Sequence, residues 1–242
     1  MSPLLAQTRL ELTVILRNGE SLLVTLALPV GCLVFFSAAD VLPIEGDAVD
    51  FLAPDVLALA VLSTAFANLA ISTGFDRSYG VLKRLGVTPL GRRRLVQAKT
   101  LAALAMLVIQ TAVLVPAALA LGWRPDVEVV PLVAAIGLAT VAFCGLALLL
   151  AGRLPALVTL AAANAMFLLQ LVLSGMVFPV DKLPSGVRDG TKFLPSTALT
   201  DGIHGAVDHG ATVPTRVWPV LVVWAVVAVS AAASQFRWDP DR

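Results

Sequence analysis

The sequence contains few side chains whose types and spacing could carry out chemistry. Its two histidines, His204 and His209, lie in one polar segment, and its two cysteines, Cys32 and Cys144, lie in separate apolar runs. Cysteines in such runs usually act as small buried hydrophobes, so we expect neither a disulfide nor a metal site. We predict that both histidines lie on the surface and that no residue of this chain is catalytic.

Two short motifs approach the patterns of hydrolytic enzymes without completing them. Segment 86–93 reads Gly-Val-Thr-Pro-Leu-Gly-Arg-Arg, which has the glycine spacing of a phosphate-binding loop but lacks its Lys and its Ser/Thr. Ser174 precedes Gly175, but Val172 and Leu173 stand before it, where an intramembrane serine protease needs a glycine-rich setting. The sequence therefore predicts a chain that is not an enzyme and binds no cofactor itself.

The elements that carry these residues are long apolar helices. Of 242 residues, 58% are hydrophobic and 14% are charged, with a mean hydropathy of +0.90. A soluble domain needs more charge to cover its surface. A hydrocarbon core of about 30 Å takes about 20 helical residues, and backbone groups inside it must bond internally. The sequence thus predicts an all-α membrane protein with one domain over residues 1–242. The uncharged runs predict six transmembrane helices at approximately 21–39, 56–75, 100–121, 129–152, 154–177 and 217–236.

Polar side chains inside the predicted spans are mild. The middles of all six spans contain no Asp, Glu, Lys, Arg or His. Ion-coupled transport usually needs such a charge within the membrane, which weighs against a stand-alone secondary transporter or channel. The remaining amides either bond between helices or line a substrate path. The candidates for a substrate path are Asn68, Gln110, Asn164 and Gln170.

Basic residues are distributed unevenly over the predicted loops. The N-terminal segment, the loop between spans two and three, the link after span four and the C-terminal tail share one side and carry most of them. The positive-inside rule places that side, with both termini, in the cytoplasm. The loop between spans two and three alone contains Arg77, Lys83, Arg84, Arg92, Arg93, Arg94 and Lys99.

Two segments outside the spans also look helical. Gln7, Glu11 and Asn18 share one helical face before the first span, which predicts either a helix lying in the membrane interface or an extension of that span. Prolines and glycines divide the segment 178–216 into short apolar clusters. We predict two short outer helices there, the second with Ser196 as its N-cap.

The loop between spans two and three contains a candidate docking helix. Val81, Leu82 and Leu85 can share one helical face, and Pro89 ends the helix. A short amphipathic helix beneath a membrane is a suitable contact for a soluble partner. The alternative is that the positive charge of this loop only fixes the topology.

Two segments carry a resemblance to a known family. Residues 75–90 contain an acid–Arg pair, a Gly, a Leu-x-x-Leu and a Thr-Pro. Residues 174–179 read Ser-Gly-Met-Val-Phe-Pro and are followed by Leu183–Pro184 and Leu194–Pro195. With six spans and cytoplasmic termini, the chain resembles the ABC-2 type permeases, the membrane subunits of bacterial ATP-binding-cassette exporters. Within that family it looks most like the daunorubicin-resistance subgroup.

The resemblance implies a function that the residues alone do not give. It implies two permease subunits, as a homodimer or heterodimer, in the bacterial cytoplasmic (inner) membrane, with ATP and Mg²⁺ bound by separate ATPase subunits. The substrate would be an amphipathic drug, lipid or lipid-linked compound, with membrane lipid but no nucleic acid as a further partner. An intramembrane enzyme or scaffold is the other alternative. The residues that match the family's ATPase-docking role are Asp76, Arg77, Gly80, Leu82 and Leu85.

Overall fold

A computed structural model describes residues 3–38, 48–88, 90–176 and 184–236, and every regular element in this part of the chain is helical. The all-α prediction is therefore confirmed. The elements are α1 Pro3–Arg17, α2 Gly19–Ala38, α3 Ala48–Leu62, η1 Ser63–Asn68, α4 Leu69–Ser78, α5 Val81–Gly86, α6 Gly91–Ala120, α7 Val129–Ala151, α8 Ala156–Leu173, α9 Ser185–Thr191, α10 Pro195–Val207 and α11 Val217–Gln235.

Several of these helices are long and apolar enough to cross a membrane, which confirms the membrane-protein class. Helix α2 overlaps the predicted first span, but its apolar stretch Thr25–Phe35 is shorter, so the complete six-span layout stays a prediction. Among the residues that the structure describes, five helical stretches are long enough: Val49–Ser78, Gly91–Ala120, Val129–Ala151, Ala156–Leu173 and Val217–Gln235.

The second and third helical rods are longer than the predicted spans 56–75 and 100–121. Helix continues from α3 through η1 into α4, and α6 begins already at Gly91. The apolar run marks the length inside hydrocarbon, whereas the backbone bonds of a helix can continue into charged sequence beyond it. As a result, Asp55 and Lys99, which flank the predicted spans, lie within helices.

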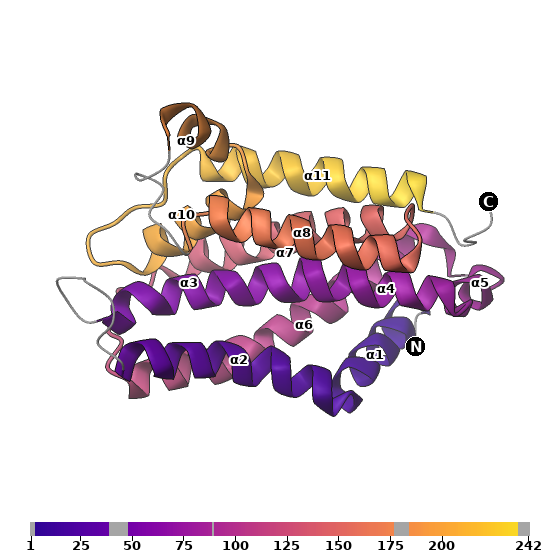
Figure 1. The fold of residues 1–242 in the computed structure, drawn as a ribbon, viewed down its shortest axis with the longest axis horizontal. Coiled ribbons are helices and arrows are strands. Elements are labelled where there is room, and N and C mark those ends of the chain that lie inside the picture. Colours follow the sequence, from indigo (N-terminus) through magenta and orange to yellow (C-terminus); the bar gives the residue numbers. More distant parts are fainter. Residues whose placement is uncertain (1–2, 39–47, 89, 177–183, 237–242) are drawn as a thin grey trace.

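The two ends of the bundle differ in what they hold. In Figure 1 the long helices run side by side, with α5, the start of α1 and the end of α11 near one end. Helices α9 and α10 and the start of α3 lie at the opposite end. We call these the α5 end and the α10 end. The predicted docking loop and the predicted outer helices therefore lie at opposite ends of the bundle.

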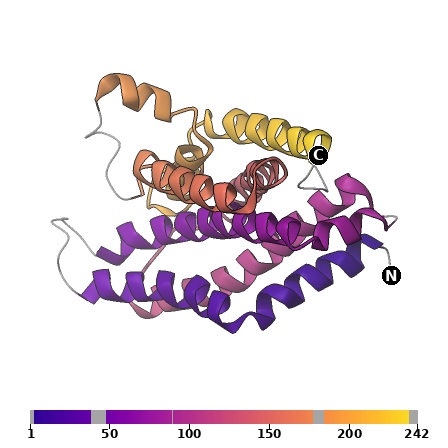
Figure 2. The ribbon, with the colours of Figure 1, turned by 45° about the vertical axis from the view of Figure 1, so that its right-hand side comes forward.

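Helix α1 is a separate helix and not a straight extension of α2. The chain bends between Arg17 and Gly19, where the two helices meet (Figure 2). Helix α1 packs along α6, and its predicted polar face turns inward: Gln7 is buried and its Nε2 donates to Glu11 Oε1 at 2.9 Å. Leucines and a valine on its other faces are exposed. Its position in a membrane interface stays a prediction.

Helix α10 is embedded in the bundle. It packs against α7, α11 and α3, and Leu199 and Ile203 are completely buried. Short helices α9 and α10 thus occur where two were predicted, but the predicted cap is wrong. The helix begins at Pro195, a residue favoured in the first turn, so Ser196 falls inside the helix and Leu194 takes the N-cap position without a side-chain hydrogen bond.

Candidate functional site

A cavity of about 250 Å³ lies among α1, α2, η1, α4 and α6. Part of its wall is apolar and includes Met106, Ile71 and Ile15. A pocket with mostly apolar walls and a few convergent polar groups is the usual form of a small-molecule site, and this mixture suits an amphipathic molecule. The polar residues that line the cavity include Thr25, Thr64, Asn68, Ser72, Glu11, Asp76 and Lys99.

A π-helical turn, η1, shapes the polar wall of the cavity. Such turns interrupt α-helices and occur frequently at functional sites. Thr64 Oγ1 donates to Gln110 Oε1 at 2.9 Å, and Gln110 Nε2 donates to the carbonyl oxygen of Thr25 at 3.0 Å. Asn68 Nδ2 reaches Thr25 Oγ1 at 3.4 Å. Two of the four predicted path residues, Asn68 and Gln110, therefore belong to one polar cluster that joins η1, α2 and α6.

The other two predicted path residues lie on α8, which does not line the cavity. Asn164 is exposed on the outer face of α8. Gln170 is buried, and neither atom of its amide has a hydrogen-bond partner among the described protein atoms. Of the four predicted residues, Asn68 thus lines the cavity, Gln110 is bonded to two of its lining residues, and the other two lie on α8.

Lys99 joins three helices where the cavity approaches the α5 end. Its Nζ lies 3.0 Å from Glu11 Oε2 of α1 and 3.1 Å from Asp76 Oδ2 of α4, and its side chain is 2% exposed. Burying an ammonium group is costly unless carboxylates pair with it. The sequence pattern marked Asp76 and Glu11 separately, but it did not indicate that Lys99 holds them together.

Arg77 points away from this cluster and connects other helices. It is buried, and its Nη1 donates to the carbonyl oxygens of Ala151 and Leu154, both at 3.2 Å. These carbonyls lie at the end of α7 and in the turn before α8, where a helix leaves carbonyl oxygens without partners in its own backbone. Arg77 therefore fastens α4 to the turn between α7 and α8.

Helix α5 carries the remaining predicted docking residues. Gly80 has a φ of 73°, a conformation that favours glycine and lets the chain turn between α4 and α5. Leu82 is 1% exposed and Leu85 packs partly buried against the core of this chain. The apolar side chains that remain exposed beside them are Tyr79, Val81 and Val87.

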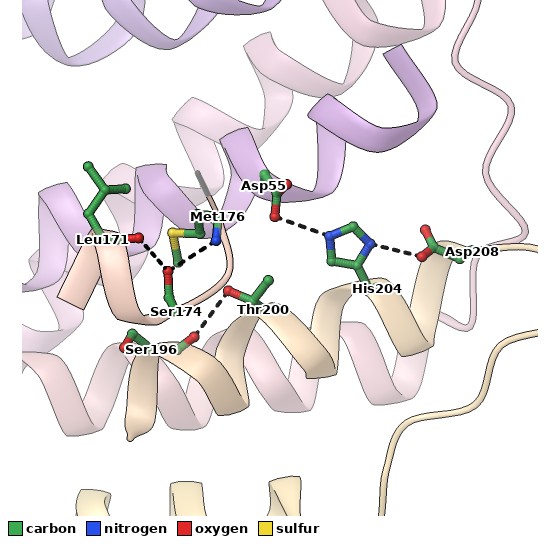
Figure 3. A network of polar contacts seen from close by, with 8 residues as sticks. All are labelled: Asp55, Leu171, Ser174, Met176, Ser196, Thr200, His204 and Asp208. Atoms are coloured by element: carbon green, nitrogen blue, oxygen red, sulfur yellow. Dashed lines mark hydrogen bonds and ion pairs between the residues drawn. The ribbon is translucent and has the colours of Figure 1, made fainter. Parts of the chain in front are cut away.

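A second ionic cluster lies at the α10 end (Figure 3). His204 Nε2 lies 3.1 Å from Asp55 Oδ1, and its Nδ1 lies 2.8 Å from Asp208 Oδ2. Burial disfavours the charged imidazole, but the hydrogen bonds and charges of Asp55 and Asp208 outweigh it and raise the pKa of His204 to about 9. The His204 side chain is 24% exposed, and the sequence analysis did not connect it with Asp55, because that partner lies 149 residues away along the chain.

Neither cluster has the composition of a metal centre. Within the described ranges, no group of His, Cys, Asp and Glu side chains is arranged so that it could hold a metal ion. Cys32 and Cys144 are free thiols on different helices.

The fold defines a helical membrane protein with a cavity among its helices. The chain belongs to the ABC-2 type transporter family, because the model of that family matches residues 4–207, which is most of the chain. The resemblance carried by the two sequence motifs is thereby confirmed at the level of the family, and the daunorubicin-resistance subgroup stays a prediction. A comparison with individual curated proteins found no match.

Proposed function

We propose that this chain is the permease subunit of an ATP-driven exporter and that a separate ATP-binding-cassette subunit hydrolyses the ATP. Membership of the ABC-2 family supports the transport role. The proposed coupling to a separate ATPase is supported by one observation. The cluster of Lys99, Glu11 and Asp76 lines the cavity and lies at the end of α4 that leads into α5. A movement of α5 would therefore reach the cavity wall through a short and tightly paired connection.

The ATPase subunit docks on the exposed side of α5. Tyr79, Val81 and Val87 are 75%, 43% and 88% exposed, and apolar side chains gathered in water mark an interaction site. The positive-inside rule places this end in the cytoplasm, where the ATPase binds ATP and Mg²⁺. Leu82 and Leu85 hold α5 against its own chain and so position this docking surface.

The cavity is the start of the substrate path. Asn68 is an exposed amide in a helix that crosses the membrane, and it faces a cavity whose other walls are apolar. The hydroxyl groups of Thr25 and Ser72 add polar groups to the same lining. This combination fits an amphipathic drug, lipid or lipid-linked compound that enters with its apolar part in the membrane.

A second permease subunit packs against α8 in the bacterial inner membrane. Asn164, Leu168 and Leu169 form an exposed face of α8, while the opposite face packs against α4. A side-chain amide gains nothing from lipid but can hydrogen-bond across a contact between helices. Cross-linking of Asn164→Cys to its symmetry mate in native membranes tests this contact, and a monomeric pattern at every lipid composition would contradict it.

The docking surface provides the main experiment. Tyr79→Ser combined with Val87→Ser removes exposed apolar area without touching the core of this chain. We expect normal membrane insertion, at least about tenfold weaker co-purification of the ATPase, and a matching loss of ATP-dependent export in vesicles. Val130→Ser, which alters a 79% exposed side chain at the α10 end, is the matched control. Unchanged co-purification in the double variant would refute the docking surface.

A further inference from the structure

Helix α10 is held in two different ways on its two sides. Toward α7 it is close-packed, because a Cβ on Gly202 would lie 2.9 Å from the Cβ of Ala135. The carbonyl oxygen of Val207 also accepts a hydrogen bond at 2.9 Å from the backbone amide of Asp126, just before α7. The start of α7 and α10 are therefore built as one body.

One face of α10 is polar, and its His204 meets α3. Ser196, Thr200, His204 and Asp208 follow one another at intervals of four residues, so they share one face of the helix and its C-cap. His204 of this row contacts Asp55 of α3 (Figure 3). We call Asp55 and these four residues the polar seam. Its members Asp55 and His204 meet where α10 packs against α3.

The polar seam contains buried groups that the packed state leaves without partners. Asp55 is 5% exposed and Ser196 is 0% exposed, yet Asp55 Oδ2 and Ser196 Oγ have no hydrogen-bond partner among the described protein atoms. Gln170 of α8, a helix that also packs against α10, has an unpartnered buried amide as well. Nearly all buried polar groups in folded proteins are paired, so unpaired ones need an explanation.

We propose that α10 parts from α3 along the polar seam to admit water or the polar part of the transported compound, and that the ion pair of His204 with Asp55 is the latch that keeps the seam closed. Opening the seam hydrates Asp55 and Ser196, which favours the open state, whereas the ion pair favours the closed state. Only the passage of the compound rests on the proposed function. The parting of α10 from α3 is a property of this chain itself.

The charges around His204 define how the latch responds to pH. Asp55 of α3 and Asp208 at the end of α10 contact it, and they raise its pKa to about 9. Helices α7 and α8 contribute no Asp, Glu, Lys, Arg or His. The other charged groups near the starts of α3, α7 and α11 include Asp50, Arg124, Asp126, Glu128 and Arg216, of which Arg216 pairs with Asp201 at 2.7 Å. In the folded protein the latch is therefore charged below about pH 9 and loses its cation as the pH rises through that value.

The test is the accessibility of a thiol placed in the seam. Thr200→Cys, in a background with Cys32→Ala and Cys144→Ala, puts the probe at a 6% exposed position. The rate of its modification by a small water-soluble thiol reagent is divided by the rate at Val130→Cys, an exposed position at the same end. We expect His204→Gln and Asp55→Asn each to raise this ratio at least tenfold, and the double variant to raise it no further. Asp201→Asn, which breaks an exposed ion pair of the same helix, is the matched control and should leave the ratio unchanged.

A pH series separates a latch from a purely structural contact. In the Thr200→Cys protein with His204 and Asp55 unchanged, the ratio of the two modification rates should rise as the pH passes about 9, where the imidazolium loses its charge. His204→Lys should move this rise upward, because a lysine keeps its charge to about pH 10. If this ratio does not change with pH in the Thr200→Cys protein, the ion pair of His204 with Asp55 is not a latch. This result is decisive even where the His204 and Asp55 variants fail to fold. If the unsubstituted protein shows no ATP-dependent export but the expected changes in thiol modification occur, the proposed function is refuted and the latch is not.

Discussion

The two ionic clusters at opposite ends of the bundle are built from the same parts. Each places one cation between two carboxylates, and each joins segments that are distant in the sequence. Lys99 is 2% exposed and joins α1, α4 and α6, whereas the His204 side chain is 24% exposed and joins α10 to α3. The lysine keeps its charge at any physiological pH, while the histidine can lose its charge in mild alkali. The comparison indicates a fixed connection at the α5 end and a releasable one at the α10 end.

The strongest test of the fixed connection is removal of its cation. Lys99→Met leaves Glu11 and Asp76 facing each other without a counter-ion in a partly buried site. Removing one partner of a buried ion pair is strongly destabilising, so we expect a loss of about 3 kcal/mol in the free energy of unfolding. Thermal unfolding of the detergent-solubilised chain measures it, and Lys99→Arg, which keeps the charge, should lose less. Equal stability of the native chain and Lys99→Met would show that this end is not fixed by the cluster.

The next largest loss in the free energy of unfolding is expected where α5 packs against its own chain. Leu82 is 1% exposed, so Leu82→Ala should leave a cavity and destabilise the protein by about 2 kcal/mol or more. Val87→Ala removes a similar apolar group from an 88% exposed position and should change stability very little. The same thermal unfolding assay compares the two. If the two variants lost equal stability, α5 would be a loosely held element and the contrast between the ends would weaken.

The pH dependence of stability distinguishes the releasable cluster. The folded-state pKa of His204, about 9, lies above the value of about 6.5 for a free imidazole, so its contribution is complete below about pH 6.5. Stability should then fall by up to about 1.4 kcal/mol per pH unit and the contribution should be gone above about pH 9. Unfolding of the native chain and of His204→Gln, followed between pH 6 and 10, measures the difference. Parallel curves for the two proteins would mean that His204 gains nothing from its carboxylates.

The smallest effect is expected at the exposed ion pair between Asp201 of α10 and Arg216, the residue before α11. The side chains of Arg216 and Asp201 lie 2.7 Å apart and are 47% and 28% exposed. Ion pairs in contact with solvent contribute little, so Asp201→Asn should lower stability by about 0.5 kcal/mol or less. A loss as large as that of Lys99→Met would show that burial does not decide the strength of these clusters.

Hydropathy predicted the class of the protein and much of its helical layout. The predicted spans at 129–152 and 217–236 match α7 and α11 within a residue, because these helices contain no charged side chain. The predictions at 56–75 and 100–121 are too short, because α4 and α6 continue into charged sequence. The motifs at residues 75–90 and 174–179, taken together with the predicted spans, also indicated the family that the match over residues 4–207 confirms.

By itself the sequence determined that this chain is a bundle of apolar helices of the ABC-2 family, since burying long uncharged runs has one general solution in a membrane. Only the tertiary structure decided which polar groups meet: Lys99 with Glu11 across 88 residues, and His204 with Asp55 across 149. It also decided that Leu82 faces the core of its own chain. The physical reason is that hydropathy fixes the length of a helix in the membrane but not its rotation about its axis or its neighbours, and these two choices select every polar contact between helices.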